Sequence, residues 1–347
     1  MVVNAVVSAL GLAEDDVRGV LEAASLAPSI HNSQPWRFVL RPDRIELRSD
    51  EGGRLRAADP GGRELRLSCG AALFNVRLAL QGLGIRPLVT LVPGRTTPGA
   101  LAVIRRGGSF TTTDETRALL RAVGRRRTNR HPFTDAAVPD GHRVQVVRAA
   151  ELERSWLHVV DDRAELAVLR GLVRQANRRQ LADPTVQAEL AAWTGGRASP
   201  GHGVPRASAG FVPEPQDEWA LRDFSSGAPV ERPSGKDYEP SPLVVVLCSF
   251  YDGPLGELQA GQALQRVLLS ATALGLSASF LSQVIEVDGT REGLRRALGG
   301  SLFPQTVLRL GFGSPVPRTP RLPVDDLVVP LPGVPASTGS RNPGGTR

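Results

Sequence analysis

The chain has 347 residues, of which 41% are hydrophobic and 22% are charged, so it is long enough to bury one large core or two intimate ones. Its net charge of +7 comes almost entirely from arginine, since Lys236 is the single lysine. We interpret this charge as a solvated basic surface. A nucleic-acid surface is disfavoured, because basic and aromatic residues do not interleave and no zinc-finger spacing is present.

The two cysteines, Cys69 and Cys248, lie in apolar stretches and have neither metal-ligand spacing nor the number needed for a disulfide framework. This favours a reducing compartment. Residues 1–12 are apolar but short, lack a basic start and run into acidic residues, so they do not resemble a signal peptide. No apolar run reaches the length of a membrane span. We therefore expect a cytoplasmic protein that spans no membrane.

In chain order, the first part of the sequence predicts helices that alternate with short strands. Residues 14–26 place Val17, Val20, Leu21 and Ala24 at helical spacing, and Pro28 ends this helix. A strong helix is expected at 70–83. The other expected elements are strands at 36–40, 45–48, 87–92 and 100–104, and a helix at 113–123.

The second part of the sequence predicts a similar mixture, with a nearly continuous apolar strand at 243–250 that reads as buried. The other expected elements are strands at 156–160, 278–287 and 306–312, and helices at 164–181, 185–193, 257–274 and 291–298. Helices and strands mixed in this way indicate an α+β fold with a central mixed or antiparallel sheet in each half.

Residues 195–240 interrupt this pattern with a long stretch rich in glycine, proline and serine. The stretch also holds Phe211, Trp219, Phe224 and Tyr238, aromatic residues that a pure linker would lack. An excursion of this length is usually functional or disordered. We weigh a folded flap over a site against plain disorder, and we expect the tail at 331–347 to be disordered.

The two long helices resemble each other. GAALFNVRLALQGLGI begins at Gly70 and GQALQRVLLSATALGL begins at Gly261, and the two align without gaps. Chance matching of helix-forming residues is the alternative. A duplicated fold in one chain would have a pseudo-two-fold axis, with a pocket at the seam between its halves.

Two kinds of motif carry candidate chemistry. The loop APSIHNSQPWRF, which starts at Ala27, offers Ser29, Asn32 and Gln34 as hydrogen-bonding groups for a flat heteroaromatic edge, unless it is only a polar turn. The segments RRRTNRHPF, from Arg125, and RTPRLP, from Arg318, offer arginines and a hydroxyl that suit a phosphate, unless they are only solvated loops.

Taken together, these motifs resemble the nitroreductase family of FMN oxidoreductases. In that family an R-x-S-x-R/K segment and a late basic residue bind the FMN phosphate, and a P-S-x-x-N-x-Q-P-W segment lines the flavin ring. The resemblance implies that Arg126, Thr128, Arg130 and Arg321 hold the phosphate, with threonine in place of serine. It implies that Pro28, Ser29, Asn32 and Gln34 line the ring.

The order of these motifs departs from that of ordinary members, in which the phosphate motif comes first. Here the ring motif comes first, each motif occurs once, and the pattern looks like a fused dimer that keeps one FMN site. The Acg family has this arrangement, and the match includes HNSQPWR, CGAALFNVRLAL and TPRLP. The resemblance implies a lid over the flavin and poor reduction by NAD(P)H.

These inferences predict a pseudo-dimer in one chain. Its halves are expected at 1–124, with the ring motif, and at 125–330, with the phosphate motif and a lid insertion at 195–240. The assembly would be a monomer with internal pseudo-symmetry or a weak homodimer. Backbone groups at Phe280, Leu281, Ser282 and Gln283 are further candidates for the flavin edge.

Hydride transfer through FMN requires no side-chain nucleophile. No catalytic side chain is therefore predicted, although His31 could approach the flavin. The activity expected is that of an FMN-dependent oxidoreductase, with NAD(P)H as a possible donor and a small nitro-aromatic or quinone-like acceptor. The alternative is a non-catalytic FMN-binding or storage protein.

Overall fold

The structure is a computed structural model that describes residues 6–219, 222–225, 232–233, 235, 237–239 and 242–329. The tail predicted to be disordered, 331–347, lies outside the described residues.

The first half contains a four-stranded antiparallel sheet in the order β1-β2-β4-β3, packed against two helices. Side chains from β1, β2 and β4 share one apolar core with α1 and α2. The elements are α1 (Glu14–Ser25), β1 (Trp36–Arg41), β2 (Arg44–Ser49), α2 (Arg63–Gly82), β3 (Ile85–Leu91), β4 (Ala100–Ser109) and α3 (Asp114–Arg125).

The second half repeats this plan with an antiparallel sheet in the order β5-β6-β8-β7. All seven residues of β6 are buried, as its unbroken apolar sequence predicts. The elements are α4 (Asp140–Glu151), β5 (Trp156–Val159), α5 (Arg163–Ala182), α6 (Pro184–Ala192), β6 (Leu243–Ser249), α7 (Pro254–Ala273), β7 (Ser277–Phe280), α8 (Gln283–Glu286), α9 (Asp288–Ala297) and β8 (Phe303–Gly311). The predicted α+β class is confirmed.

Two local predictions were wrong. The strand expected at 278–287 ends at Phe280, because Leu281 makes the last ladder bond to Val307 and the chain then turns into the short helix α8. Val284 and Ile285 are apolar in either conformation, so the sequence pattern does not distinguish a strand from a helix over so short a run. Helix α4, Asp140–Glu151, was not predicted at all, because its buried face is narrow.

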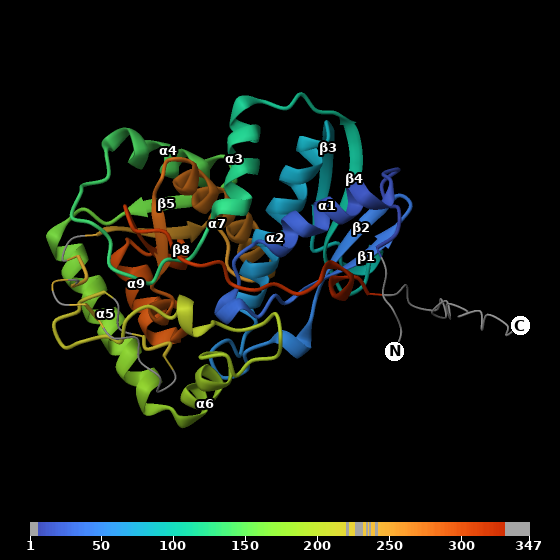
Figure 1. The fold of residues 1–347 in the computed structure, drawn as a ribbon. Coiled ribbons are helices and arrows are strands. Elements are labelled where there is room, and N and C mark those ends of the chain that lie inside the picture. Colours follow the sequence, from blue (N-terminus) through green and yellow to red (C-terminus); the bar gives the residue numbers. More distant parts are fainter. Residues whose placement is uncertain are drawn as a thin grey trace, which may run out of the picture.

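Helices α2 and α7 lie side by side between the two sheets and join the halves (Figure 1). They touch at the two glycines from which the internal repeat was aligned. A Cβ atom at Gly70 would lie 2.9 Å from Cα of Gly261 and would overlap the carbonyl oxygen of Leu258. A Cβ atom at Gly261 would lie 2.8 Å from Cα of Gly70 and would overlap the carbonyl oxygen of Leu67. The contact is reciprocal, as an approximate two-fold axis requires.

The chain after β8 returns to the first half, where it runs across the molecule as the red segment of Figure 1. Val328 forms a parallel bridge with Phe38 of β1, and Val329 donates a backbone hydrogen bond to the carbonyl of Phe38 at 2.9 Å. Asp325 pairs with Arg18 of α1 at 3.0 Å. This returning segment, residues 314–329, therefore ties the end of the second half to the first sheet.

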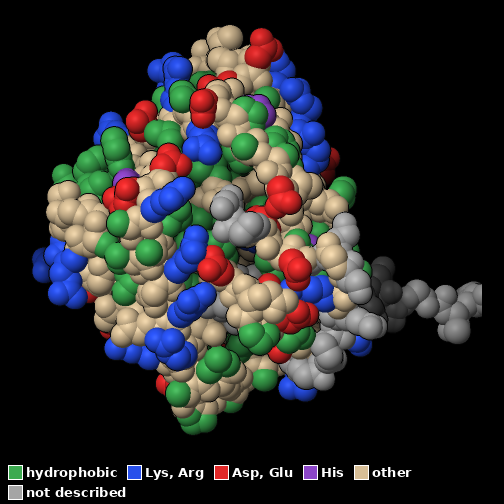
Figure 2. All heavy atoms as spheres, turned by 90° about the vertical axis from the view of Figure 1, so that its left-hand side faces the viewer, with side chains coloured by type: hydrophobic (Ala, Val, Ile, Leu, Met, Phe, Trp, Pro, Cys, Tyr) green, Lys and Arg blue, Asp and Glu red, His purple; other side chains and the backbone are tan. Residues whose placement is uncertain are grey.

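Arginine side chains stand among acidic ones on the face turned to the viewer in Figure 2. Arg143 pairs with Asp161 at 3.0 Å, and Arg291 pairs with Asp252 at 2.7 Å. Charges compensated in this way are typical of a solvated surface. Among the described residues, no helix is long and apolar enough to cross a membrane, and no cluster of three or more histidine, cysteine, aspartate or glutamate side chains could hold a metal ion.

The crossing of α2 and α7 makes a stability prediction. Gly70→Ala and Gly261→Ala should each lower the free energy of unfolding by about 1–3 kcal/mol, because the helices must separate to admit a methyl group. Gly171→Ala, within α5 and with no atom near its added methyl group, is the control and should change stability by at most about 1 kcal/mol, in the stabilising direction. Chemical denaturation measures all three. Wild-type stability in Gly70→Ala and Gly261→Ala would contradict the close crossing.

Candidate functional site

The loop between α1 and β1 has an unusual backbone. His31, Asn32 and Gln34 have φ values of 47°, 58° and 50°, in the left-handed region that non-glycine residues rarely occupy. Each such residue costs on the order of 1 kcal/mol unless its surroundings hold it there, and such residues cluster at functional sites. The whole loop lies within the segment singled out from the sequence.

Side chains of this loop hold two distant segments in place. The Nδ2 of Asn32 donates to the carbonyls of Gly203 at 3.1 Å and Pro320 at 3.0 Å. The Nε2 of Gln34 donates to the carbonyl of Gly201 at 2.7 Å, and its Oε1 accepts from the backbone N–H of Leu322 at 3.0 Å. The loop therefore fastens both the 195–240 segment and the returning segment to the first half.

A pocket rich in arginine lies where this loop meets the returning segment and the end of α3. Arg126 is only 5% exposed, and its Nε and Nη1 have no hydrogen-bond partner among the described residues. Its Nη2 makes one long contact, 3.4 Å, to the carbonyl of Leu26. The residues that line this arginine pocket include Ser29, Asn32, Arg126, Arg127, Thr128, Arg130, Arg318, Thr319 and Arg321.

The electrostatics of the arginine pocket favour an anion. Burial, together with neighbouring arginines, lowers the pKa of Arg126 to about 10 and that of Arg321 to about 9. Within the described parts of the chain, none of Arg126, Arg127, Arg318 and Arg321 forms an ion pair with a carboxylate. Buried charges are normally paired. A bound dianion such as a phosphate monoester would supply the missing compensation.

Thr128 and Arg130 connect the arginine pocket to a second, larger pocket that they also line. Thr128 forms a parallel bridge with Ala278 of β7, and Asn129 donates its backbone N–H to the carbonyl of Ala278 at 2.9 Å. This bridge fixes the arginine segment against the second sheet. Burial, together with nearby Arg222, lowers the pKa of Arg130 to about 10.

The second pocket, here called the seam pocket, lies between the two halves. From the first half it receives the loop residues Pro28, Ser29, Ile30 and His31 and the α2 residues Glu64, Leu67 and Ser68. From the second half it receives Leu264 of α7, Ser279 and Phe280 of β7, the turn residues Leu281 and Ser282, Gln283 of α8 and Arg309 of β8.

The remaining wall of the seam pocket comes from the 195–240 segment, which contributes Ala209, Phe211, Trp219, Arg222, Phe224 and Tyr238. Trp219 is 1% exposed, and the Oη of Tyr238 donates to the carbonyl of Arg130 at 2.7 Å. Arg222 forms an ion pair with Glu286 of α8. The described parts of this segment are thus packed against the body of the protein.

The charged groups of the seam pocket come from several elements. The imidazole of His31 is buried and lies beside Arg222 and Arg130, and these effects lower its pKa to about 3. His31 is therefore neutral over the physiological range. Glu286 opposes this shift, and its own pKa is lowered by Arg222 despite its burial. Among the carboxylates near the pocket, Glu286 is thus firmly ionised.

The structure brings most of the predicted site residues together. Arg126, Thr128, Arg130 and Arg321 share the arginine pocket with Asn32, whereas Pro28 and Ser29 line both pockets. Phe280, Leu281, Ser282 and Gln283 line the seam pocket. Gln34 lines neither pocket. Its side chain makes the contacts to Gly201 and Leu322 described above.

Sequence reasoning missed Glu64, Ser68 and Arg222. The helix containing the first two was expected to start at residue 70, but α2 starts at Arg63. Glu64, Leu67 and Ser68 have i, i+3, i+4 spacing, so an earlier helix start would have placed them on one face. Arg222 lies in the 195–240 segment, where no periodic pattern indicates which side chains point inward.

No protein-family model matches the chain. Among curated proteins, "Putative NAD(P)H nitroreductase Rv3131" of Mycobacterium tuberculosis is 34% identical over 326 residues, which are 90% of this chain and 91% of that protein. "Putative NAD(P)H nitroreductase acg" of the same species is 31% identical over 320 residues, 90% of this chain and 95% of that protein. A solved nitroreductase with bound FMN from Bacteroides fragilis has a TM-score of 0.37 and 12% identity, with 66% of this chain and 97% of that chain covered.

The chain thus has an α+β fold with two four-stranded antiparallel sheets, and two connected pockets lie between its halves. At 31% to 34% identity over nine-tenths of its length, the chain belongs to the nitroreductase family, in the group that includes Acg.

The arginine pocket leads to a prediction that can be tested without the cofactor. Inorganic phosphate should raise the melting temperature of the protein, by an amount corresponding to about 1.4 kcal/mol at ten times its dissociation constant. Arg126→Met should abolish this effect. In the absence of phosphate, Arg126→Met should be at least as stable as wild type, because it removes a buried charge that has no partner.

The neighbouring exposed residue supplies the control, since Arg125→Met should keep both the phosphate response and the wild-type stability. Thermal unfolding followed by circular dichroism measures all three proteins. A phosphate response that survives in Arg126→Met would show that the anion binds elsewhere.

Proposed function

We propose that the chain is an FMN-binding oxidoreductase of the nitroreductase type, which holds one flavin between its two halves. The observation that carries this proposal is a pair of arginines without a carboxylate partner, buried Arg126 and half-buried Arg321, in a pocket that continues into an aromatic-lined cavity. FMN has the matching chemistry, with a phosphate at one end and a flat ring system at the other. When bound, it would carry two electrons between a donor and an acceptor.

The residues present fit the phosphate of this cofactor. Arg126 offers Nε and Nη1 groups that have no other partner, and Thr128 offers a hydroxyl at the junction of the pockets. Arg321 is already oriented by hydrogen bonds from its Nε to the carbonyl of Ser25 at 2.7 Å and from its Nη1 to the Oδ1 of Asn32 at 2.8 Å. A donor held in this way loses little further freedom when it binds.

The seam pocket fits the ring. Pro28 and Ser29 line it from one half and residues 280–283 from the other, so a flat molecule there would contact both halves. Asn32 and Gln34 then act through the segments that they hold rather than through direct contact with the ring. His31, neutral and buried, supplies a polar edge to the same wall.

This arrangement supports one site in each chain. We propose that residues 1–124 and 125–330 are the two halves of a pseudo-dimer, because each contains one antiparallel sheet and α2 and α7 join them reciprocally. The arginine segment at 125–130 occurs once, and the loop at 28–34 occurs once. The proposed assembly is a monomer or a weak homodimer in the cytoplasm.

The flavin content tests this assignment. Release by denaturation should yield about one FMN per chain, and Arg126→Ala or Arg321→Ala should weaken FMN binding about tenfold or more, since a hydrogen bond to a charged group contributes about 1.5–3 kcal/mol. Arg125→Ala, exposed and adjacent, should bind FMN as wild type does. Calorimetric titration of FMN into each apoprotein gives the affinities. Two FMN per chain would contradict the single-site proposal, and no FMN after reconstitution would contradict the cofactor assignment.

We further propose that the 195–240 segment is a lid that restricts access to the ring. Phe224 lines the seam pocket between Arg130 and His31. The Arg130 guanidinium lies 4.4 Å from its ring centroid, and the centroid of the His31 ring, edge-on to it, lies at 5.9 Å. Trp219 and Tyr238 anchor the segment on either side. A nicotinamide must stack on the flavin to transfer hydride, so a lid in this position favours slow reduction by NAD(P)H.

Removing part of the lid tests whether it excludes the nicotinamide. The side chains of Gln216 and Asp237 lie 3.5 Å apart, so a short Gly/Ser linker can replace residues 217–236 while Tyr238 and the Gly201 and Gly203 contacts are kept. In stopped-flow experiments, the shortened protein should be reduced by NADPH about tenfold faster or more with FMN still bound, since an occluding barrier of about 1.4 kcal/mol corresponds to a factor of ten.

Two point variants refine this test. Phe224→Ala should also speed reduction, whereas Phe250→Ala, an exposed aromatic residue outside the pocket, should not. Rapid turnover of NADPH by the intact protein would contradict the lid proposal and favour an ordinary nitroreductase with a nitro-aromatic or quinone-like acceptor.

The second candidate function is FMN binding or storage without turnover. The observation that favours it is the set of contacts that the 195–240 segment makes with the body, which include the Arg222–Glu286 ion pair and the burial of Trp219. A lid held this firmly would retain the flavin and shield it. Slow reduction of the shortened protein, with FMN bound, would support this candidate.

A further inference from the structure

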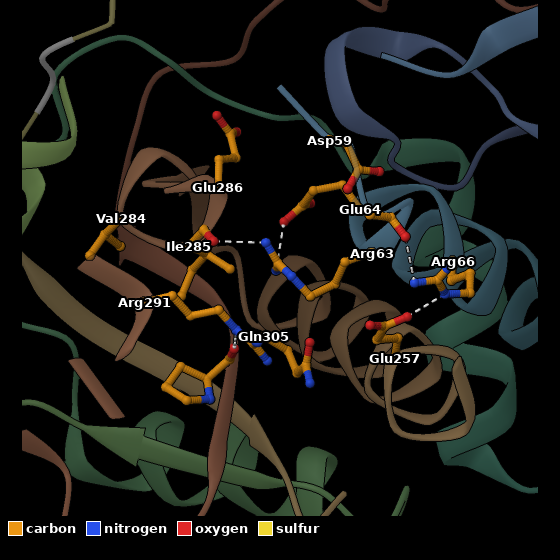
Figure 3. Close-up of polar contacts among 12 residues, drawn as sticks. Asp59, Arg63, Glu64, Arg66, Glu257, Val284, Ile285, Glu286, Arg291 and Gln305 are labelled. Atoms are coloured by element: carbon orange, nitrogen blue, oxygen red, sulfur yellow. Dashed lines mark hydrogen bonds and ion pairs between the residues drawn. The ribbon is translucent and has the colours of Figure 1, made fainter. Parts of the chain in front are cut away.

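Glu64 is a carboxylic acid that nothing in the proposed cofactor binding uses. It lies in the first turn of α2, is 7% exposed, and faces the seam pocket together with Leu67 and Ser68 on the same side of the helix. Figure 3 shows it between Asp59 and Arg63, at the junction of α2 with the second half. A buried carboxyl group normally has strong partners.

The partners of Glu64 are weak for a buried carboxylate. Its Oε1 lies 3.3 Å from the Nη1 of Arg63, and no hydrogen bond to its Oε2 is present among the described residues. Arg63 is shared, because its Nη2 donates to the carbonyl of Ile285 at 2.7 Å (Figure 3). The Oε2 of Glu64 is therefore available to a molecule bound in the seam pocket.

Two carboxylates of the described residues lie near Glu64, and each accepts a hydrogen bond from a neutral donor. Asp59, from the loop before α2, accepts the backbone N–H of Leu65 at 2.9 Å. Glu286, from α8, is paired with Arg222 of the 195–240 segment and accepts the Nε2 of Gln180 at 2.6 Å. His31, which lines the same pocket, is neutral.

We propose that the Glu64 carboxyl group is the proton donor of the seam pocket, serving a nitro or quinone-like acceptor bound there. This inference rests on the proposed flavin function. Two-electron reduction of a nitro group to a nitroso group and water, or of a quinone to a hydroquinone, consumes one hydride and one proton. The hydride comes from the reduced cofactor. The proton comes from Glu64, whose O–H bond breaks as an O–H bond forms at an oxygen of the acceptor.

The environment of Glu64 suits both states of this cycle. Burial, reinforced by Glu286 and Asp59, raises the pKa of Glu64 to about 8 against the opposing effect of Arg63 and Arg222. The group is therefore protonated at neutral pH and ready to donate. After donation, the carboxylate faces the same two guanidinium groups, which stabilise it until solvent returns the proton.

The experiment uses three variants. Glu64→Gln keeps the size of the side chain but cannot donate a proton, and Glu64→Asp restores a titrating carboxyl group. Glu257→Gln is the matched control, because Glu257 is an equally buried glutamate that pairs with Arg66 and lies outside both pockets. The affinity of each variant for FMN is measured first. It should match the wild-type affinity within about twofold, well below the tenfold loss expected for Arg126→Ala or Arg321→Ala.

Infrared difference spectra of the FMN-free protein give the readout that is independent of activity. The wild type and Glu257→Gln should show a carboxylic acid C=O band that is lost as the pH rises through about 8. The band should be absent in Glu64→Gln, and Glu64→Asp should show one with a displaced midpoint. Persistence of the same band in Glu64→Gln would assign it to another group and overturn the inference.

The second readout is a single turnover of photoreduced protein with a soluble quinone, which avoids any dependence on NAD(P)H. The wild-type rate should fall above about pH 8, and Glu64→Gln should be slower by about 100-fold and independent of pH, within the range of general acid catalysis. Glu64→Asp should recover part of the rate. If FMN binds but Glu64→Gln keeps the wild-type rate and pH profile, Glu64 is not the donor. If the wild type binds no FMN, it is the proposed function that fails.

Discussion

The reciprocal contact between Gly70 of α2 and Gly261 of α7 is the constraint on which the rest of the structure depends. Because neither residue has a side chain, the two backbones approach closely enough for one helix to pack against both halves. This contact sets the position of the first turn of α2, so that Arg63 reaches the carbonyl of Ile285 across the seam. Both pockets lie along the seam that the crossing creates, and a wider helix separation would disconnect the loop at 28–34 from the strand β7.

The contrast between compensated and uncompensated arginines gives the site its chemical character. Several other buried charges of the described structure have ion-pair partners: Arg309 pairs with Glu239, Arg222 with Glu286, and Glu46 with Arg41, Arg44 and Arg48. Arg126 is buried and Arg321 is half-buried, but both lie among other arginines. Repulsion among these arginines lowers the free energy of unfolding, so an anion that compensates their charge also stabilises the fold. Affinity and stability are therefore linked at this pocket.

The fold class and the location of most helices could be predicted, because α1, α2 and α7 carry apolar residues at helical spacing over three or more turns. The convergence of Arg126 and Arg321 was inferred from a family resemblance, since no local pattern relates two residues so far apart. The contacts of Gln34 could not be predicted from its motif: the sequence offers its amide to a ring, and in the structure this amide bonds to Gly201 and Leu322. Glu64 was missed because the helix was expected to begin at residue 70, whereas α2 begins at Arg63 and includes Glu64 in its first turn.

The returning segment brings Arg321 against Asn32, two residues separated by 289 positions in the chain. Contacts over such separations form late in folding, because the intervening chain must be ordered first. During synthesis, the first sheet and the loop at 28–34 leave the ribosome long before Arg321 exists. The flavin would therefore meet an incomplete pocket until the second half has folded and its last segment has crossed back. Retention of the flavin would therefore require the complete fold. A chain truncated before residue 321 would be expected to form both sheets and still fail to retain its flavin.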